Sequence, residues 1–168
     1  VTGSPGEAAP IVFSGEAPDG MKIACDKRIL GCVLYVPADW EVLYADGAVC
    51  ARAGDGTNVG LLRIVNREAE SILDYVRGLK EEYIARWGAD NVTADMTDPA
   101  PETRGEITLY RFWLSLTRDG QTYVIEQVVA VRTRGLNAAA YLITYTALEE
   151  NDGTHRDEWR RIVEEAGL

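Results

Sequence analysis

Three long strand-like segments in the second half of the chain constrain its fold more than any other feature. They span residues 106–116, 121–133 and 138–148, and each contains β-branched and aromatic residues. Asp119-Gly120 joins the first two, and this pair favours a tight hairpin because glycine readily adopts a positive φ. Gly135 lies in the connection between the second and the third. Consecutive strands joined in this way form an antiparallel β-meander.

Alternating side chains in the 106–116 segment predict a sheet that is covered on both faces. Successive side chains of a strand point to opposite faces. One face would carry Ile107, Leu109, Arg111 and Trp113, and the other Tyr110, Phe112 and Leu114. Because both faces carry apolar side chains, both need a covering layer. We expect Trp113 to pack in the core.

The first helix is predicted for residues 71–87. Ser71 and Asp74 have the spacing of a capping box at its start. Gly88 is expected to end it, because a helix often ends with a glycine in the left-handed conformation. A buried stripe follows from apolar residues spaced by three and four, namely Ile72, Tyr75, Val76, Leu79, Tyr83 and Trp87.

A second amphipathic helix is predicted for residues 155–166. Thr154 and Asp157 have the spacing of a capping box, and Gly167 is expected to end the helix. Its apolar stripe would consist of Trp159, Ile162, Val163 and Ala166. His155, the single histidine of the chain, would lie in the first turn at the solvent-exposed surface.

Shorter strands are predicted before the first helix, at residues 21–25, 32–36, 41–45, 48–53 and 58–65. Pro37 is expected to end the second of these, and Trp40 to turn inward as the chain enters the hairpin at Asp46-Gly47. The polar residues 89–105 predict a loop with one short edge strand at 92–96. The order of strands, helix, strands and helix indicates the α+β class, with an antiparallel β-sheet flanked by helices on both sides.

Length, composition and charge limit the organisation and the partners. A chain of 168 residues fits one domain, which we place at residues 21–168. Residues 1–20, rich in Gly, Pro, Ala, Ser and Glu, are predicted to form a flexible tether like that which follows the lipid-modified cysteine of a bacterial surface lipoprotein. The alternative is an unstructured N-terminus of a cytoplasmic protein. A net charge of −10 argues against nucleic acid as a partner, because phosphates need clustered Lys and Arg.

Few segments carry a recognisable chemical motif. The glycine-rich residues 54–60 (GDGTNVG) precede a strand, whereas a nucleotide site needs a helix N-terminus there, so they predict a hairpin loop. One histidine excludes a multi-histidine metal site within the chain. Cys25 and Cys32 flank a short connection and fit either a disulfide or two buried thiols, and their spacing with Cys50 matches no zinc motif. No cofactor is indicated.

Carboxylates leave two alternatives open. Asp95, Asp98 and Glu102 lie on the 89–105 loop and supply oxygen ligands of the kind that Ca²⁺ prefers, but they lack the regular spacing of a calcium loop. A solvated acidic loop is the simpler interpretation. An enzyme with an Asp/Glu acid–base pair also stays open, because such a pair can assemble from distant positions. No catalytic residue is assigned.

Four segments together are similar to the PsbP-like superfamily: VLYVPADWEV, AVCARAGDGTNVGLLRIV, SILDYVRGLKEEYIARWG and AAAYLITYTAL. That group includes the photosystem II extrinsic protein PsbP, a Ran-binding nuclear-transport factor and bacterial lipoproteins. The most specific element is the strand that ends at Pro37 and is followed, three positions later, by Trp40. The resemblance covers residues 21–168 and implies an α/β/α sandwich used for binding and assembly. No metal-binding or Ran-binding residues of the group match this sequence.

These observations together predict a non-catalytic accessory or binding protein. We expect it to be extracytoplasmic and anchored to a bacterial membrane through a lipid only, with a protein or a cell-envelope component as its partner. One alternative is a small-molecule or Ca²⁺-binding module that uses the acidic residues 90–102, and another is the carboxylate enzyme. The oligomeric state is left open.

Overall fold

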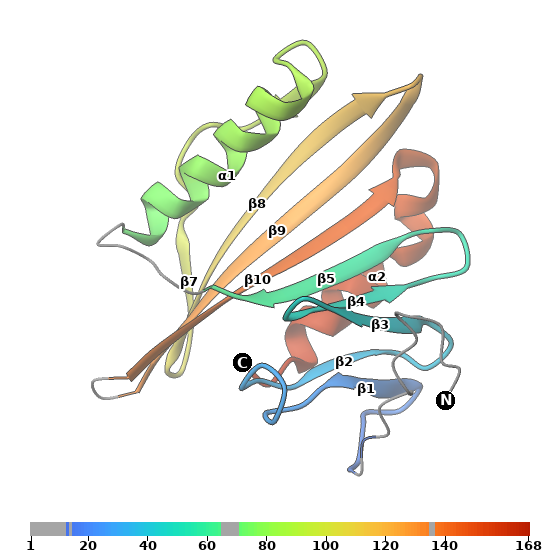
Figure 1. The fold of residues 1–168 in the computed structure, drawn as a ribbon, viewed down its shortest axis with the longest axis vertical. Coiled ribbons are helices and arrows are strands. Elements are labelled where there is room, and N and C mark those ends of the chain that lie inside the picture. The colour runs from blue at the N-terminus through green and yellow to red at the C-terminus, as the bar shows by residue number, and fades with distance from the viewer. Residues whose placement is uncertain (1–12, 14, 65–70, 135–136) are drawn as a thin grey trace, which may run out of the picture.

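A twisted antiparallel sheet with one helix on each face forms the body of the protein (Figure 1). The computed structural model describes residues 13, 15–64, 71–134 and 137–168. The helices are α1 (Ile72–Trp87) and α2 (Glu149–Glu165). The strands are β1 (Met21–Cys25), β2 (Leu34–Pro37), β3 (Glu41–Ala45), β4 (Ala48–Arg52), β5 (Asn58–Arg63), β6 (Val92–Ala94), β7 (Pro101–Arg104), β8 (Ile107–Arg118), β9 (Gln121–Arg134) and β10 (Asn137–Leu148). The architecture confirms the predicted α+β class.

The meander β8–β9–β10 forms the largest part of the sheet and confirms the prediction from the second half of the chain. Within the described residues, the strands of the main sheet follow the order β3-β4-β5-β10-β9-β8-β6, while β7 also pairs with β8 and β1 pairs with β2. Both Asp-Gly turns have positive φ at both central residues: 48° and 75° at Asp46-Gly47, and 51° and 76° at Asp119-Gly120. These values define type I′ hairpins, whose twist matches that of the strands they join.

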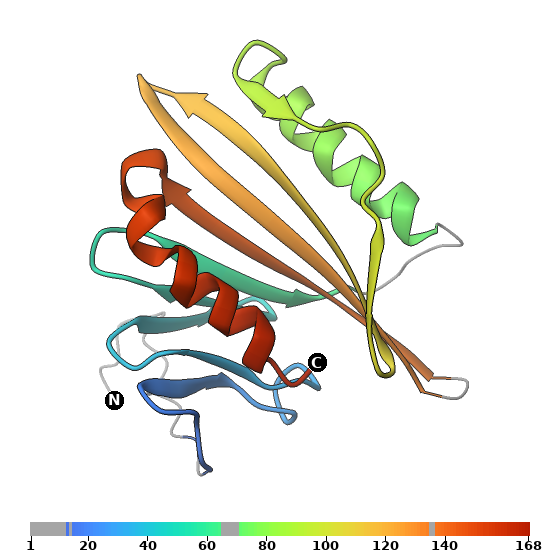
Figure 2. The ribbon, with the colours of Figure 1, turned by 180° about the vertical axis from the view of Figure 1, so that it is seen from behind.

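The two helices cover opposite faces of the sheet, as the alternation along β8 predicts (Figure 2). On the α2 face, one large core contains Leu109, Val128, Tyr145 and Trp159, and the Tyr145 and Trp159 rings stack at a centroid distance of 5.2 Å. On the α1 face, two smaller apolar clusters hold the helix. One is built on Val76, Phe112, Val129 and Leu142, and the other on Val92, Leu114, Leu116 and Ile125.

Local capping determines where α1 begins and ends. The Ser71 side chain accepts a hydrogen bond from the backbone N–H of Asp74 at 3.1 Å. Gly88 follows the last turn with a φ of 90°, and its N–H donates to the carbonyl of Ile84 at 2.8 Å. Both ends agree with the bounds expected from the sequence.

The start of α2 differs from the prediction. The helix begins at Glu149, directly after β10, so Thr154 and His155 lie inside it and Thr154 is not the N-cap. The early start has two physical causes. Three acidic residues occupy the first turn, where the helix dipole favours negative charge. Asp152 also accepts a hydrogen bond from the buried Tyr145 at 2.9 Å, which holds this turn against the sheet.

Two further expectations about the edge of the sheet are wrong. The segment expected as a loop contains β7, which pairs with β8 from Pro101↔Tyr110 to Arg104↔Ile107. Trp113, expected in the core, is 51% exposed. Because α2 packs on β2, β9 and β10, it leaves the outer part of β8 uncovered on this face.

The predicted tether of residues 1–20 lies largely outside the described residues. At its described end, the carbonyl of Asp19 accepts a hydrogen bond from Arg161 of α2 at 2.7 Å. The carbonyl of Gly20 accepts another from the N–H of Ala38 at 2.9 Å. These two bonds attach the entry of β1 to the folded domain. None of the described helices is long and apolar enough to span a membrane.

Candidate functional site

A cleft of about 410 Å³ lies between α1 and the face of the sheet that it covers. We call it the α1 cleft. Its walls are mainly apolar: Leu79, Tyr83 and Trp87 come from α1, and Leu116, Ile125 and Leu142 come from β8, β9 and β10. Clefts of this size, lined by apolar and aromatic side chains with a few polar groups, are typical of small-molecule sites.

The α1 cleft forms because the helix packs through two separate clusters. Leu79 belongs to the cluster around Val129, and Tyr83 belongs to the cluster around Ile125. Between Ile125 and Val129 on the same face of β9 stands the polar Gln127. A polar pair therefore interrupts the apolar surface, since Gln127 lies opposite Thr144 of β10.

The Gln127 amide is the polar group at the floor of the α1 cleft. Its side chain is buried, with only 3% of the residue exposed. Nε2 donates to Thr144 Oγ1 at 3.0 Å, whereas no group of the described chain donates to Oε1. A buried acceptor without a donor costs about 1–3 kcal/mol, and most buried polar atoms in proteins have a partner. The oxygen itself is buried, so it lies beneath the lining of the cleft and is not open to a molecule within it.

A second polar site, which we call the His155 cluster, joins three distant segments of the chain. His155 Nε2 lies 2.7 Å from Asp55 Oδ2 in the β4–β5 loop, and His155 Nδ1 lies 2.8 Å from Glu158 Oε1. The Trp40 ring meets the imidazole edge to face at a centroid distance of 5.7 Å. His155 is only 8% exposed, so its predicted place at the solvent surface is wrong. Its buried environment comes from Asp55, 100 positions away, a contact that no local pattern reveals.

The electrostatics of the His155 cluster favour an imidazolium between two carboxylates. Burial acts to lower the pKa of His155, but the hydrogen bonds to Glu158 and Asp55 outweigh it and raise that pKa. Burial acts to raise the pKa of Asp55, but hydrogen bonds from Thr57 and His155 outweigh it and hold that pKa below its ordinary value. These contacts tie the turn at Trp40 and the glycine-rich loop to α2, and they become an ion pair when His155 is protonated.

The glycine-rich loop is followed by a strand and lacks the helix N-terminus that a phosphate-binding loop of this kind needs. It connects β4 to β5 as the hairpin that the sequence predicts, with the N–H of Ala53 bonded to the carbonyl of Thr57 at 2.8 Å. A shallow depression of about 490 Å³ beside it is lined by residues that include Asp39, Arg52 and Asp55. Both imidazole nitrogens of His155 are already bonded to carboxylates, so neither is available to exchange a proton with a molecule in this depression.

The three acidic residues considered as calcium ligands have separate partners. Asp98 pairs with Arg77 at 2.5 Å, Glu102 pairs with Arg111 at 2.9 Å, and Asp95 accepts bonds from Thr97. Hydrogen bonds from these partners lower the pKa of each carboxyl group.

The acidic loop therefore presents no shared set of ligands. In the part of the chain that the structure describes, no three His, Cys, Asp or Glu side chains meet as a metal site.

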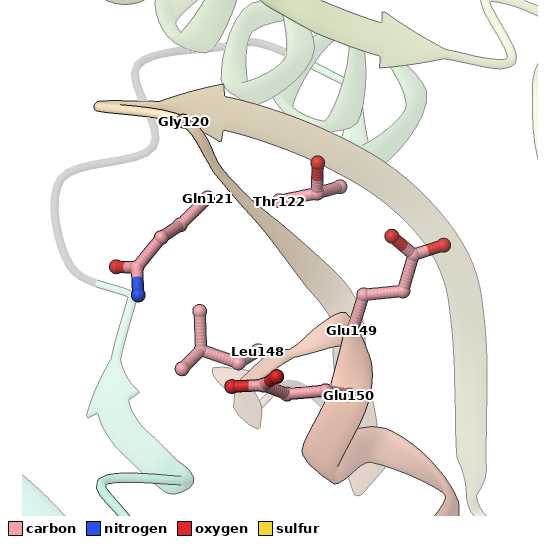
Figure 3. A pocket seen from close by; sticks show the side chains of 6 residues that line it. All are labelled: Gly120, Gln121, Thr122, Leu148, Glu149 and Glu150. Carbon is pink, nitrogen blue, oxygen red and sulfur yellow. The ribbon is translucent and has the colours of Figure 1, made fainter.

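Adjacent carboxylates do occur at the start of α2, where they line a pocket of about 250 Å³ with Leu148 and residues 120–122 (Figure 3). Figure 3 shows the carboxylates of Glu149 and Glu150 turned in different directions. Both side chains are exposed to solvent. A general acid needs a raised pKa, which burial or a close second carboxylate provides. In this pocket the two carboxylates are exposed and turned away from each other.

Cys25 and Cys32 are both fully buried and lie next to each other, while Cys50 is half-buried. The three are free thiols. The neighbouring Cys32 thiol lowers the pKa of Cys25, and the same contact together with burial raises the pKa of Cys32. The pair is positioned by the β1–β2 ladder, in which Cys25 lies opposite Leu34.

An antiparallel sheet with a helix on each face places this chain in the α+β class. Comparison with solved structures shows more specifically that its fold is PsbP-like. Cyanobacterial PsbP (CyanoP) from Synechocystis sp. PCC 6803 superposes with a TM-score of 0.60 at 13% identity, over 94% of this chain and 97% of that one.

Two other solved structures are similar. LpqN, described as involved in cell envelope biogenesis of Mycobacterium tuberculosis, has a TM-score of 0.58 at 15% identity and covers 82% of both chains. PA94, a protein of unknown function from Pseudomonas aeruginosa, has a TM-score of 0.55 at 13% identity, over 84% of this chain and 92% of that one. No protein-family model matches the sequence, and no curated protein is similar to it in sequence. At these identities the similarity describes the fold, as the PsbP-like resemblance predicts.

Proposed function

We propose that this protein is an extracytoplasmic, non-catalytic accessory protein of a bacterial cell envelope, and that it works by binding a small molecule in the α1 cleft. The observation that carries the proposal is the cleft itself, with apolar walls from α1 and the sheet and a few polar side chains, among them Thr144 and Thr146. Ligand sites combine these two features, because apolar contact supplies affinity and a few polar groups supply orientation.

The arrangement of titratable groups supports binding in preference to catalysis. A nucleophile or a general base must be within hydrogen-bond reach of the group it activates. Both nitrogens of His155 bond to carboxylates, and the α1 cleft is lined by one carboxylate, Glu82, on the exposed side of α1. These contacts stabilise the fold and leave no acid–base pair inside the cleft.

The proposed location rests on a protein of similar structure and on the composition of residues 1–20. LpqN is described as acting in cell envelope biogenesis, and residues 1–20 have the composition of a lipoprotein tether. Fractionation of cells that express the full-length gene, combined with metabolic labelling by a palmitate analogue, tests this part. The expected result is a labelled protein in the envelope fraction. An unlabelled protein in the cytosol would refute the location.

Native mass spectrometry tests the binding function. The protein should be purified from its own source under non-denaturing conditions, together with Thr146→Trp and Thr122→Trp. Thr146 is half-buried and lines the α1 cleft, so the indole should fill it, whereas Thr122 is half-buried outside the cleft. We expect a bound small molecule in the unmodified protein and in Thr122→Trp, and none in Thr146→Trp. A protein without a bound molecule, which is also not stabilised by an envelope extract in a thermal-shift assay, would overturn the proposal.

A further inference from the structure

We infer that the molecule bound in the α1 cleft is an anionic amphiphile, with an apolar body inside the cleft and a carboxylate or phosphate head group beside Arg86. This inference rests on the proposed function, because it assigns a ligand class to the same cleft. Three observations support it: the change in side-chain character along the cleft, two arginines over one indole ring, and the weak pairing of those arginines within the protein.

The cleft changes in character along the axis of α1. Leu79 and Leu142 lie toward one end, where they belong to the same apolar cluster. Arg86 and Trp87 line the other end, at the last turn of the helix. Burial of apolar ligand surface is favourable at the first end, whereas an ionised group needs a counter-charge and finds one at the second. The two ends together fit a molecule with an apolar body and a charged head.

Two guanidinium groups lie over the indole ring of Trp87. The Cζ atom of Arg86 is 5.3 Å from the ring centroid, and that of Arg118, at the end of β8, is 4.7 Å from it. A guanidinium held over an aromatic ring loses less conformational freedom when it binds an anion. Its paired N–H groups match the oxygens of a carboxylate or a phosphate. This end of the cleft therefore holds two positive charges in position for an anion.

The two arginines are weakly paired within the protein. Arg86 takes part in none of the ion pairs that the described residues form. Arg118 contacts Asp119 at 3.5 Å, and both of these side chains are more than half exposed. Ion pairs between exposed groups contribute little, so this contact leaves Arg118 able to bind another anion.

The negative charges near this end are fewer or more distant. Glu82 also lines the cleft, but it lies one helical turn before Arg86, further from Trp87. The C-terminus of α1 contributes about half a negative elementary charge, which two guanidinium groups exceed. A head group in contact with Arg86 and Arg118 is therefore closer to positive than to negative charge.

Two dyes that differ by one charged group test the inference. N-phenyl-1-naphthylamine is neutral, whereas 8-anilinonaphthalene-1-sulfonate has the same rings and a sulfonate that represents the anionic head. We expect both to bind the unmodified protein saturably, and neither to bind Thr146→Trp, which fills the cleft. Arg86→Met removes the charge and keeps an unbranched side chain. It should weaken binding of the anionic dye about 3- to 10-fold and leave the neutral dye within about twofold.

Three further variants separate a local charge effect from a general one. Arg160→Met is the matched control, because Arg160 is an exposed residue of α2 that pairs with Asp157, and it should leave both affinities unchanged. Arg118→Met should weaken the anionic dye alone. Arg86→Lys should retain part of the affinity, since it keeps the charge without the planar pair of donors. If Arg86→Met weakens both dyes equally, or weakens neither, the inference is overturned.

Competition identifies the head group. Decanoate, decyl phosphate and decan-1-ol share one chain length and differ only at the end of the chain. We expect at least one of the two anions to displace the neutral dye at a concentration about threefold or more below that of decan-1-ol. The more effective anion then distinguishes a carboxylate from a phosphate. Decan-1-ol that displaces the dye as well as both anions do would overturn the inference.

The two proposals fail in different ways. Neutral-dye binding that Thr146→Trp abolishes, combined with anionic-dye binding that ignores Arg86→Met, would refute the ligand class and leave the cleft as a binding site. If neither dye binds and the native mass spectrum shows no bound molecule, both proposals are refuted. If Thr146→Trp does not fold, mutual displacement of the two dyes tests whether they share one site, and independent binding would refute the inference.

Discussion

Replacing Asp55 by asparagine should destabilise the protein most at mildly acidic pH. The carboxylate bonds to His155 Nε2 at 2.7 Å, and the imidazole is buried against Trp40. A hydrogen bond to a charged group contributes about 1.5–3 kcal/mol. In a domain of this size 1 kcal/mol shifts the melting temperature by about 2–4 °C, so the expected loss is roughly 3–12 °C.

The dependence on pH follows from the direction of the pKa shift. The pKa of His155 is raised in the folded state, since the bonds to Glu158 and Asp55 outweigh burial. The stabilisation from the imidazolium is therefore fully present below its ordinary pKa, about 6.5, and is lost as pH rises through the raised value. The pKa of Asp55 is lowered, so its contribution is lost only as pH falls well below 6. The cost of Asp55→Asn should thus be largest near pH 6 and decline toward pH 9.5.

Urea unfolding followed by tryptophan fluorescence measures this effect across the pH range. Asp157→Asn is the matched control, because Asp157 lies on the same helix with its side chain 92% exposed, and the change should alter stability by less than about 0.5 kcal/mol. His155→Gln should remove the pH dependence of the Asp55 effect. An equal cost of Asp55→Asn at every pH, or a cost no larger than that of the control, would refute the ion-pair interpretation.

Three further substitutions or treatments test other features. Ser71→Ala removes the N-cap of α1 and should lower the free energy of unfolding by about 1 kcal/mol in urea titrations, whereas Ser71→Asp should not. Lys80→Met removes a buried ammonium that donates to two loop carbonyls, at 2.5 and 2.9 Å, and should cost about 2–4 kcal/mol by the same method; a neutral effect would refute this role. Mild oxidation should join Cys25 and Cys32 and stabilise the protein by about 2 kcal/mol, with a mass loss of two hydrogens in intact-protein spectra; two thiols that stay free would contradict their adjacency.

The sequence predicts those elements whose signals are local. Ser71, Asp74 and Gly88 act within a few positions of one another, and the Asp-Gly turns set the hairpins through their own φ angles. The start of α2 is mispredicted because Thr154 has a suitable local spacing, while the contact between Tyr145 and Asp152 that extends the helix is tertiary.

The candidate sites escape sequence reasoning for the same reason. His155 acquires its environment from Asp55, 100 positions away, and the α1 cleft combines a helix with strands that follow it in the chain. One signal does exist for the cleft. Gln127 interrupts an otherwise apolar alternation along β9, with Ile125 and Val129 on the same face. A polar residue in such a position indicates that the apolar contact between the sheet and its covering helix is interrupted there.

The pairing of β5 with β10 has a consequence for the order of folding. Every other ladder of the main sheet that the structure describes joins strands that are closer in sequence, whereas this one brings Arg63 to Tyr141 and Asn58 to Thr146. Contacts between residues so far apart carry the largest loop-closure entropy and form slowly. The hairpin unit β3–β5 and the meander β8–β10 should therefore assemble first as separate units, and their junction along β10 should limit the rate at which the whole sheet forms.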